Sequence, residues 1–263
     1  GASGIWSNYI RYIGAGAVAA GGIISLIKSL PLICRTFAEA MKGIFNKEKI
    51  GKEERTNRDL NIGVVLGMLA ILIILIAALP VIPIGILGAV IIVIFGFFFA
   101  TVSSRMVGLV GSSNNPVSGM AIATLLITSL ILKATGNTGA SGMIAAIAIG
   151  SVICIVAAMA GDMSQDLKTG YILGATPVKQ QYGELIGAVV SAVTIGFVLY
   201  LLNSAWGFGT AELAAPQATL MKMIVEGVMG GNLPWALVFI GVFIAIMIEL
   251  LSIPVLPFAI GLF

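Results

Sequence analysis

The sequence predicts an all-α protein, a polytopic bundle of about seven helices that cross a lipid bilayer. The composition is 59% hydrophobic and 10% charged, whereas soluble domains are roughly 45–50% apolar and about 25% charged. The apolar residues form continuous runs close to the roughly 20 residues that a helix needs to cross the hydrocarbon core. These runs lack the strict alternation of membrane β-barrel strands, so helices are the structure that satisfies the backbone in lipid.

Seven segments are predicted to span the membrane within a single transmembrane domain, residues 1–263. In chain order they are residues 13–33, 61–79, 84–101, 117–132, 143–160, 185–202 and 235–253. Many of the 33 glycines lie inside these runs. Because small residues let membrane helices approach closely, we expect a packed bundle.

The segments have recognisable boundaries. The first is rich in Gly and Ala, and a turn with Pro80 and Pro83 separates the second from the third. Pro116, which suits the first position of a helix, precedes the fourth. The loop 135–141 precedes the fifth, and the sixth follows the polar stretch described below. Trp235 opens the seventh, where an indole ring favours the membrane interface.

Charge predicts the orientation. Residues 35–59 carry seven cations and five anions, and the positive-inside rule counts only Lys and Arg, so we expect a cytoplasmic loop. The cations are Arg35, Lys42, Lys47, Lys49, Lys52, Arg55 and Arg58. Alternation from this loop places Arg105 and Lys168 inside and residues 203–234 outside, as an external loop.

The ends and the residue inventory set further expectations. The chain opens with Gly1 and ends in an apolar stretch, so we expect a fragment of a longer protein. It has no His, and Cys34 and Cys154 lack metal-ligand spacing, so we expect no disulfide, metal site or cofactor.

The first polar interruption is Ser103–Ser118, with five Ser, two Asn, two Gly and one Pro. Such a run suits a broken helix or a re-entrant turn, and unwound backbone at membrane depth is tolerated where it lines protein or a water-filled cavity. Asn115 resembles a helix cap before Pro116. Candidate pathway residues here are Arg105, Ser112, Ser113, Asn114 and Asn115. An ordinary cytoplasmic turn is the alternative.

The second interruption is the stretch 160–181. Asp162, Gln165, Asp166 and Thr169 recur at helical spacing and share one face, with Lys168 on another. Two carboxylates one turn apart repel each other when their ionisation is not screened by water. We therefore expect Asp162 and Asp166 to couple protons, and Gln165 and Lys168 to line the pathway. The alternative is a solvated cytoplasmic linker.

Three isolated charges remain. Lys28 is expected to reach the cytoplasmic face along its aliphatic stem, and Glu184 to cap the sixth span. Glu249 lies inside the last apolar run, and a carboxylate there is a functional candidate because its burial in lipid is costly.

These interruptions resemble the oligopeptide transporter family in its bacterial branch, to which the plant yellow-stripe-like carriers are related. The matching motifs are Ser103-Ser-Arg-Met-Val-Gly-Leu-Val-Gly-Ser-Ser-Asn-Asn-Pro-Val-Ser-Gly119, Gly161-Asp-Met-Ser-Gln-Asp-Leu-Lys-Thr-Gly170 and Gly174-Ala-Thr-Pro-Val-Lys-Gln-Gln181. Arg11-Tyr-Ile-Gly-Ala-Gly-Ala-Val-Ala-Ala-Gly-Gly22 is similar to the family's central region. The resemblance covers essentially the whole chain, although members are roughly twice as long.

The resemblance implies secondary active transport driven by protons, with short peptides, peptide-like solutes or metal chelates as substrates. It implies the plasma (inner) membrane of a prokaryote, with the lipid bilayer as partner, self-association into a homo-oligomer left open, and no nucleic-acid partner. A membrane-embedded enzyme and a non-transporting subunit are the competing interpretations. An intramembrane aspartyl enzyme would need a second Asp on a neighbouring span, and no predicted span supplies one. A non-transporting subunit would have no need of the polar interruptions.

Overall fold

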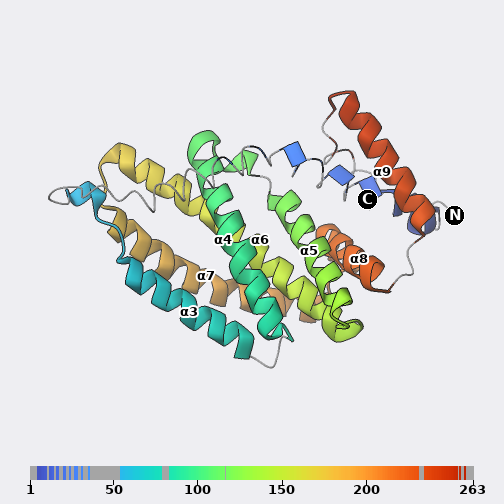
Figure 1. Ribbon diagram of the computed structural model, residues 1–263, viewed down its shortest axis with the longest axis horizontal. Coiled ribbons are helices and arrows are strands. Elements are labelled where there is room, and N and C mark those ends of the chain that lie inside the picture. The colour runs from blue at the N-terminus through green and yellow to red at the C-terminus, as the bar shows by residue number, and fades with distance from the viewer. Residues whose placement is uncertain are drawn as a thin grey trace.

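The computed structural model describes residues 5–10, 12–14, 16–17, 20–21, 24, 27–28, 31, 35, 54–78, 83–115, 117–230, 234–253, 255 and 258. Within these residues the chain is helical and contains no strand. A short π-helical segment, η1 (Trp6–Ile10), and a 3₁₀ turn, η2 (Arg55–Asn57), precede the main helices. The main elements are α3 (Ile62–Ala78), α4 (Gly85–Val110), η3 (Ser112–Asn114), α5 (Val117–Ala134), α6 (Ala140–Leu173), α7 (Pro177–Ala205), α8 (Pro216–Gly230) and α9 (Trp235–Leu250) (Figure 1).

Three described helices, α4, α6 and α7, are long and apolar enough to cross a bilayer. The apolar helices α3, α5 and α9 have 17, 18 and 16 residues, slightly fewer than the roughly 20 that a perpendicular span needs. The predicted helical membrane bundle is confirmed, and the chain is an integral membrane protein.

Six of the seven predicted spans coincide with a described helix. The first, 13–33, lies largely outside the described residues, as does most of the charged loop 35–59. Helices α4, α6 and α7 are longer than predicted because they continue into the polar stretches. Polar side chains do not end a helix, whereas a backbone in the left-handed region does: Gly111 (φ +88°) follows α4 and Gly174 (φ +71°) follows α6.

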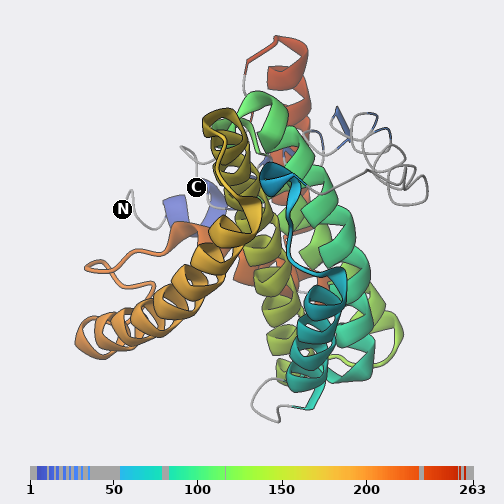
Figure 2. The ribbon, with the colours of Figure 1, turned by 90° about the vertical axis from the view of Figure 1, so that its left-hand side faces the viewer.

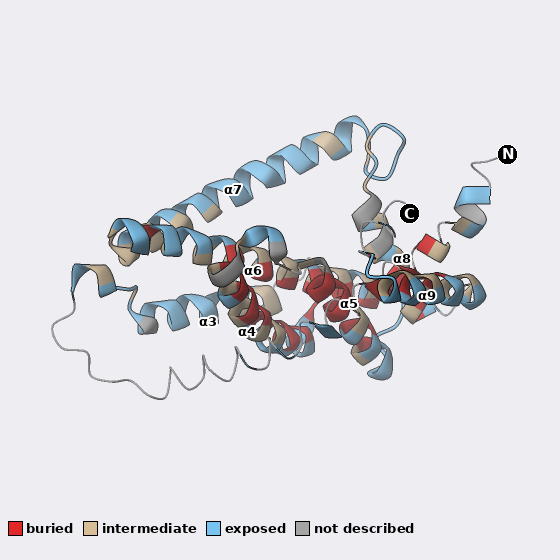
Figure 3. Ribbon diagram, turned by 90° about the horizontal axis from the view of Figure 1, so that it is seen from above, coloured by how far each residue is buried: buried red, intermediate tan, exposed pale blue. Residues whose placement is uncertain are grey.

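The core lies where α4 and α5 pack on α6. Phe99 of α4, Met120 of α5 and Ile149 and Ile153 of α6 share one buried cluster. Figure 3 shows buried residues concentrated in these helices, whereas α7 extends to one side and none of its residues is buried. The site that follows is therefore held by α4, α5 and α6.

The segment 203–234, which we predict to be an external loop, contains helix α8 at residues 216–230. Its apolar residues Ile224, Val225 and Met229 are buried, and the Lys133 ammonium of α5 donates a 2.7 Å hydrogen bond to the Val228 carbonyl. With 15 residues, α8 is too short for a perpendicular span. Its exposed, charged Lys222 and Glu226 give the segment the composition of a loop. The side of the membrane on which this segment lies stays a prediction.

Glycines provide close approach between helices, as predicted. A Cβ built on Gly241 of α9 would lie 2.0 Å from the backbone oxygen of Ile13, and one built on Gly16 would lie 2.2 Å from the backbone oxygen of Val238. An ion pair joins Lys28 to Glu249 of α9, which gives the carboxylate inside the last apolar run a cationic partner.

We expect Gly241→Ala to destabilise the protein by about 1–3 kcal/mol, because the added methyl group meets backbone that cannot move aside. Gly196→Ala is the matched control, since nothing lies within 4 Å of its Cβ position. The measurement is the thermal aggregation temperature of both variants purified in detergent. Equal temperatures for the two variants would contradict the close approach.

Candidate functional site

The chain between the third and fourth predicted spans leaves the α-helix at residues 111–115, which we call the break. Gly111 (φ +88°, ψ 162°) ends α4 in a backbone conformation that residues other than glycine rarely adopt. The 3₁₀ turn η3 follows, and Asn115 is extended (φ −72°, ψ 117°) before α5 begins. The break thus changes the chain direction while α4 and α5 stay in one bundle.

Asn115 folds back against α4 and α6. Its side-chain Nδ2 donates to Ser103 Oγ at 2.6 Å and lies 3.4 Å from the Ala157 carbonyl, which also accepts a hydrogen bond from Ser103. Ser103 is fully buried. Gly161 makes this contact possible, because a Cβ there would lie 2.8 Å from Asn115 Nδ2.

The predicted helix cap at Asn115 is wrong. A cap would accept a backbone N–H at Oδ1, but the Oδ1 atom of Asn115 is buried and has no hydrogen-bond partner within the described structure. The amide is oriented by Ser103 and Ala157 instead. What remains is a buried acceptor beside the break between α4 and α5.

The two polar interruptions, about 50 residues apart in sequence, contact each other. The Ser112 N–H donates to Gln165 Oε1 at 3.2 Å, and Ser164 Oγ donates to the Ser104 carbonyl at 2.5 Å. One end of α4, the break and the polar part of α6 therefore form one continuous polar region.

Asp166 contacts the first turns of α7. Gln180 Nε2 lies 3.3 Å from Asp166 Oδ2 and 3.2 Å from the Asp166 carbonyl. Gly170 leaves the necessary room, because a Cβ there would lie 2.0 Å from Gln180 Oε1. The Gln180 amide thus orients the Asp166 carboxylate from a neighbouring helix.

Glu184 is a residue whose position the sequence analysis missed. It was predicted to cap the sixth span, but α7 begins at Pro177 and Glu184 lies two turns into it. Its carboxylate oxygens are buried, and the carboxylate lies beside that of Asp166. The four-residue spacing from Gln180 to Glu184 was the available signal, because it places both on one helix face.

The other predicted residues lie around this region without meeting at one point. Arg105, Ser113, Asp162 and Lys168 are exposed, and the Lys168 ammonium lies 5.6 Å from the Tyr171 ring centroid. The side chain of Asn114 lies outside the described residues. In the described part of the chain, no group of three or more Cys, Asp or Glu is suited to a metal ion.

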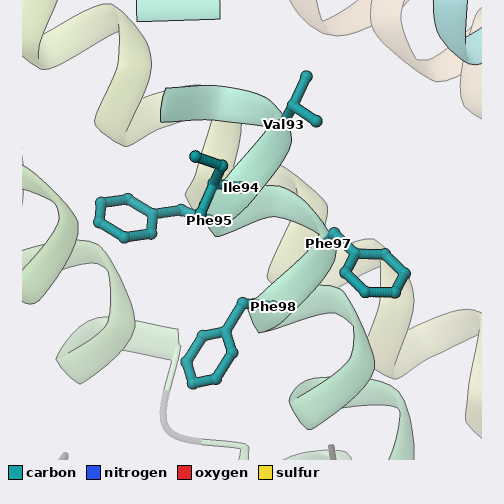
Figure 4. Close-up of a pocket in the computed structure, with 5 residues that line it drawn as sticks. All are labelled: Val93, Ile94, Phe95, Phe97 and Phe98. Carbon is teal, nitrogen blue, oxygen red and sulfur yellow. The ribbon is translucent and has the colours of Figure 1, made fainter. Parts of the chain in front are cut away.

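A separate apolar pocket of about 520 Å³ opens on α4. Its lining residues are Val93, Ile94, Phe95, Phe97 and Phe98, whose side chains project around the helix in Figure 4. These side chains carry no hydrogen-bonding group. The pocket therefore does not suit a peptide backbone, and the polar region remains the candidate site.

Comparison with known proteins assigns the family. The model of the OPT oligopeptide transporter protein family matches residues 1–263. A putative oligopeptide transporter of Haemophilus influenzae is 33% identical over 98% of this chain and 48% of its own length. A putative oligopeptide transporter of Saccharomyces cerevisiae is 31% identical over 46% of this chain and 16% of its own. A probable metal-nicotianamine transporter of Arabidopsis thaliana is 33% identical over 33% of this chain and 13% of its own.

No solved structure matches the chain. The chain spans about half the length of the Haemophilus relative and a smaller share of the other two. The family model nevertheless covers it from end to end, including both polar interruptions. The chain belongs to the OPT oligopeptide transporter family.

Proposed function

We propose that this chain is part of a secondary active carrier that takes up short peptides, peptide-like solutes or metal chelates together with protons. The observation that carries the proposal is the contact between the two polar interruptions of otherwise apolar helices, an exposed hydrogen bond from Ser112 to Gln165 and a part-buried one from Ser164 to Ser104. Its relatives are named as transporters of oligopeptides or of metal-nicotianamine. Since the chain spans about half of the Haemophilus relative, the activity is that of the whole protein.

The break is proposed to bind the substrate backbone. Asn115 Oδ1 is a buried acceptor without a donor among the described residues, and a peptide N–H supplies the missing donor. The hydroxyls of Ser112 and Ser113 are exposed next to it, and Asn114 belongs to the same turn. Gln165 completes the polar wall through its contact with Ser112. This set suits peptide groups, which need both donors and acceptors.

Charged side chains are proposed to bind the substrate termini and the proton. Arg105 and Lys168 are exposed cations able to pair with a substrate carboxylate. Asp162 and Asp166 share one face of α6, and Glu184 adds a second carboxylate beside Asp166. The proximity of the Asp166 and Glu184 carboxylates, which belong to neighbouring helices, supports a proton-coupling role for this region.

The remaining parts of the proposal concern partners and location. The metal of a chelate substrate would travel with its chelator, and the chain needs no His for this. The Haemophilus relative supports the inner membrane of a prokaryote, with the lipid bilayer as partner. Self-association into a homo-oligomer stays open. A metal-dependent membrane enzyme would need a cluster of acidic or thiol ligands, and the described residues contain none.

The first test is uptake of radiolabelled trialanine by proteoliposomes that contain the full-length carrier. We expect an imposed pH gradient, acid outside, to drive accumulation, and Asp162→Asn combined with Asp166→Asn to reduce it about a hundredfold or more, the lower end of the range for a lost proton-transfer group. Glu226→Gln, an exposed surface carboxylate on α8, is the matched control. Uptake that ignores the gradient and survives the double substitution would exclude the coupling role.

The second test concerns Asn115. We expect Asn115→Ala to raise the KM for trialanine about tenfold, because a substrate N–H loses its buried acceptor. Asn137→Ala, at an exposed position in the turn between α5 and α6, is the control and should leave the KM unchanged. Thermal aggregation temperatures of both variants check that folding is intact. An unchanged KM in a folded Asn115→Ala carrier would remove Asn115 from the binding site.

A further inference from the structure

A short segment before α3 lies against the turn that joins α6 to α7. We call residues 54–61 the strap; it contains η2 and leads directly into α3, where the Asn61 side chain accepts the Gly63 N–H at 2.8 Å. Figure 2 shows η2 beside the α6–α7 turn. The strap and the turn are about 120 residues apart in sequence, so their contact belongs to the tertiary fold.

Arg55 and Arg58 bind the backbone of the turn. The Arg55 guanidinium donates to the Gly174 carbonyl at 2.8 Å and to Thr176 Oγ1 at 2.9 Å. The Arg58 carbonyl accepts the Val178 N–H at 2.9 Å. The left-handed conformation of Gly174 ends α6 at this point, where its carbonyl meets the guanidinium. The strap thus uses hydrogen-bonding groups that the end of one helix and the start of the next leave free.

Gln181 binds the strap through both the nitrogen and the oxygen of its side-chain amide. Its Nε2 donates to Asp59 Oδ1 at 3.2 Å, and its Oε1 accepts the Leu60 N–H at 2.8 Å. The preceding residue, Gln180, binds Asp166 of α6. Consecutive glutamines in the first turn of α7 therefore attach this helix to the strap and to the carboxylate that we propose for proton coupling.

These contacts are polar and mostly exposed. No residue of η2 is buried, and exposed hydrogen bonds contribute little net stability because water competes for the same groups. Segments held by exposed hydrogen bonds without buried apolar contacts open at low free-energy cost. The strap therefore docks in one defined geometry, but its contacts add little free energy to the docked state. A contact that must release and re-form needs both properties.

We propose that the strap is a latch: docked, it fixes the start of α3 to the α6–α7 turn, and the carrier releases it to open this end of the bundle in each transport cycle. The proposal rests on the proposed transport function. Gln180 contacts Asp166, and the adjacent residue, Gln181, contacts the strap. A change in the Asp166 contact therefore reaches the strap through the start of α7. The latch thereby links proton binding at Asp166 to the opening of the bundle.

Cross-linking tests whether release is required. In the full-length carrier with Cys34→Ser and Cys154→Ala, we introduce Asp59→Cys and Gln181→Cys and treat the protein with a short bifunctional methanethiosulfonate. We expect gradient-driven trialanine uptake to fall about tenfold or more and to return after reduction, the result of arresting a gating step. Lys222→Cys with Glu226→Cys, a pair within α8, controls for the reagent. Undiminished uptake by the cross-linked carrier would refute the latch.

A second measurement does not depend on the substrate. Spin labels at Asn57→Cys and Lys179→Cys, both exposed positions, report the distance from the strap to α7. We expect two populations, one with the labels close together and one with them far apart. Arg55→Ala should lower the ratio of the close to the distant population about tenfold, because it removes two charge-assisted hydrogen bonds that hold the strap. Lys222→Ala should leave the ratio unchanged.

The outcomes separate the two proposals. A single close population that is insensitive to Arg55→Ala would show a static clamp and overturn the latch. If the carrier without a cross-link ignores the pH gradient, the proposed proton coupling fails, and the spin-label distances still decide whether the strap releases.

Discussion

α4 and α6 approach each other closely where Gly161 leaves room for the side chains of Ser103 and Asn115. A Cβ at Gly161 would meet Asn115 Nδ2 at 2.8 Å and Ser103 Oγ at 3.1 Å, so the polar contact between the helices exists because one residue has no side chain. Below it, Phe99, Ile149 and Ile153 pack in the apolar core. Burying polar groups is costly unless they are hydrogen-bonded, and the Ser103–Asn115–Ala157 contacts largely meet that requirement. The break, the candidate site and the register of α4 on α6 all depend on this contact.

Much of the fold was predictable because a bilayer imposes a simple constraint on sequence. Continuous apolar runs must form helices in lipid, and this located six of the predicted spans. The break at residues 111–115 was also visible, since glycine, asparagine and proline interrupt helices by known backbone effects. Helix ends were less predictable: α6 extends through Asp162 and Asp166 to Leu173 because nothing before Gly174 stops it.

Contacts between distant segments could not be predicted from local patterns. Helix α8 was missed because Lys222 and Glu226 give it the composition of a loop, whereas its buried face depends on α5 and α6. Glu184 and the strap were missed because their partners lie on other elements, Asp166 on α6 and the turn before α7. The polar stretches identified which residues matter chemically. The fold alone determines that Ser112 meets Gln165 and that Asn115 meets Ser103.

The contact at Gly161 also has an evolutionary consequence. A larger residue at position 161 occupies the space of the Asn115 amide, so a tolerated change there requires a smaller side chain at position 115 or at position 103. These three positions should therefore vary together in size across homologous sequences, while exposed positions on the same helix, such as 155, vary without that restriction. The combined volume of the three side chains, more than the identity of any one of them, is the quantity that selection would preserve.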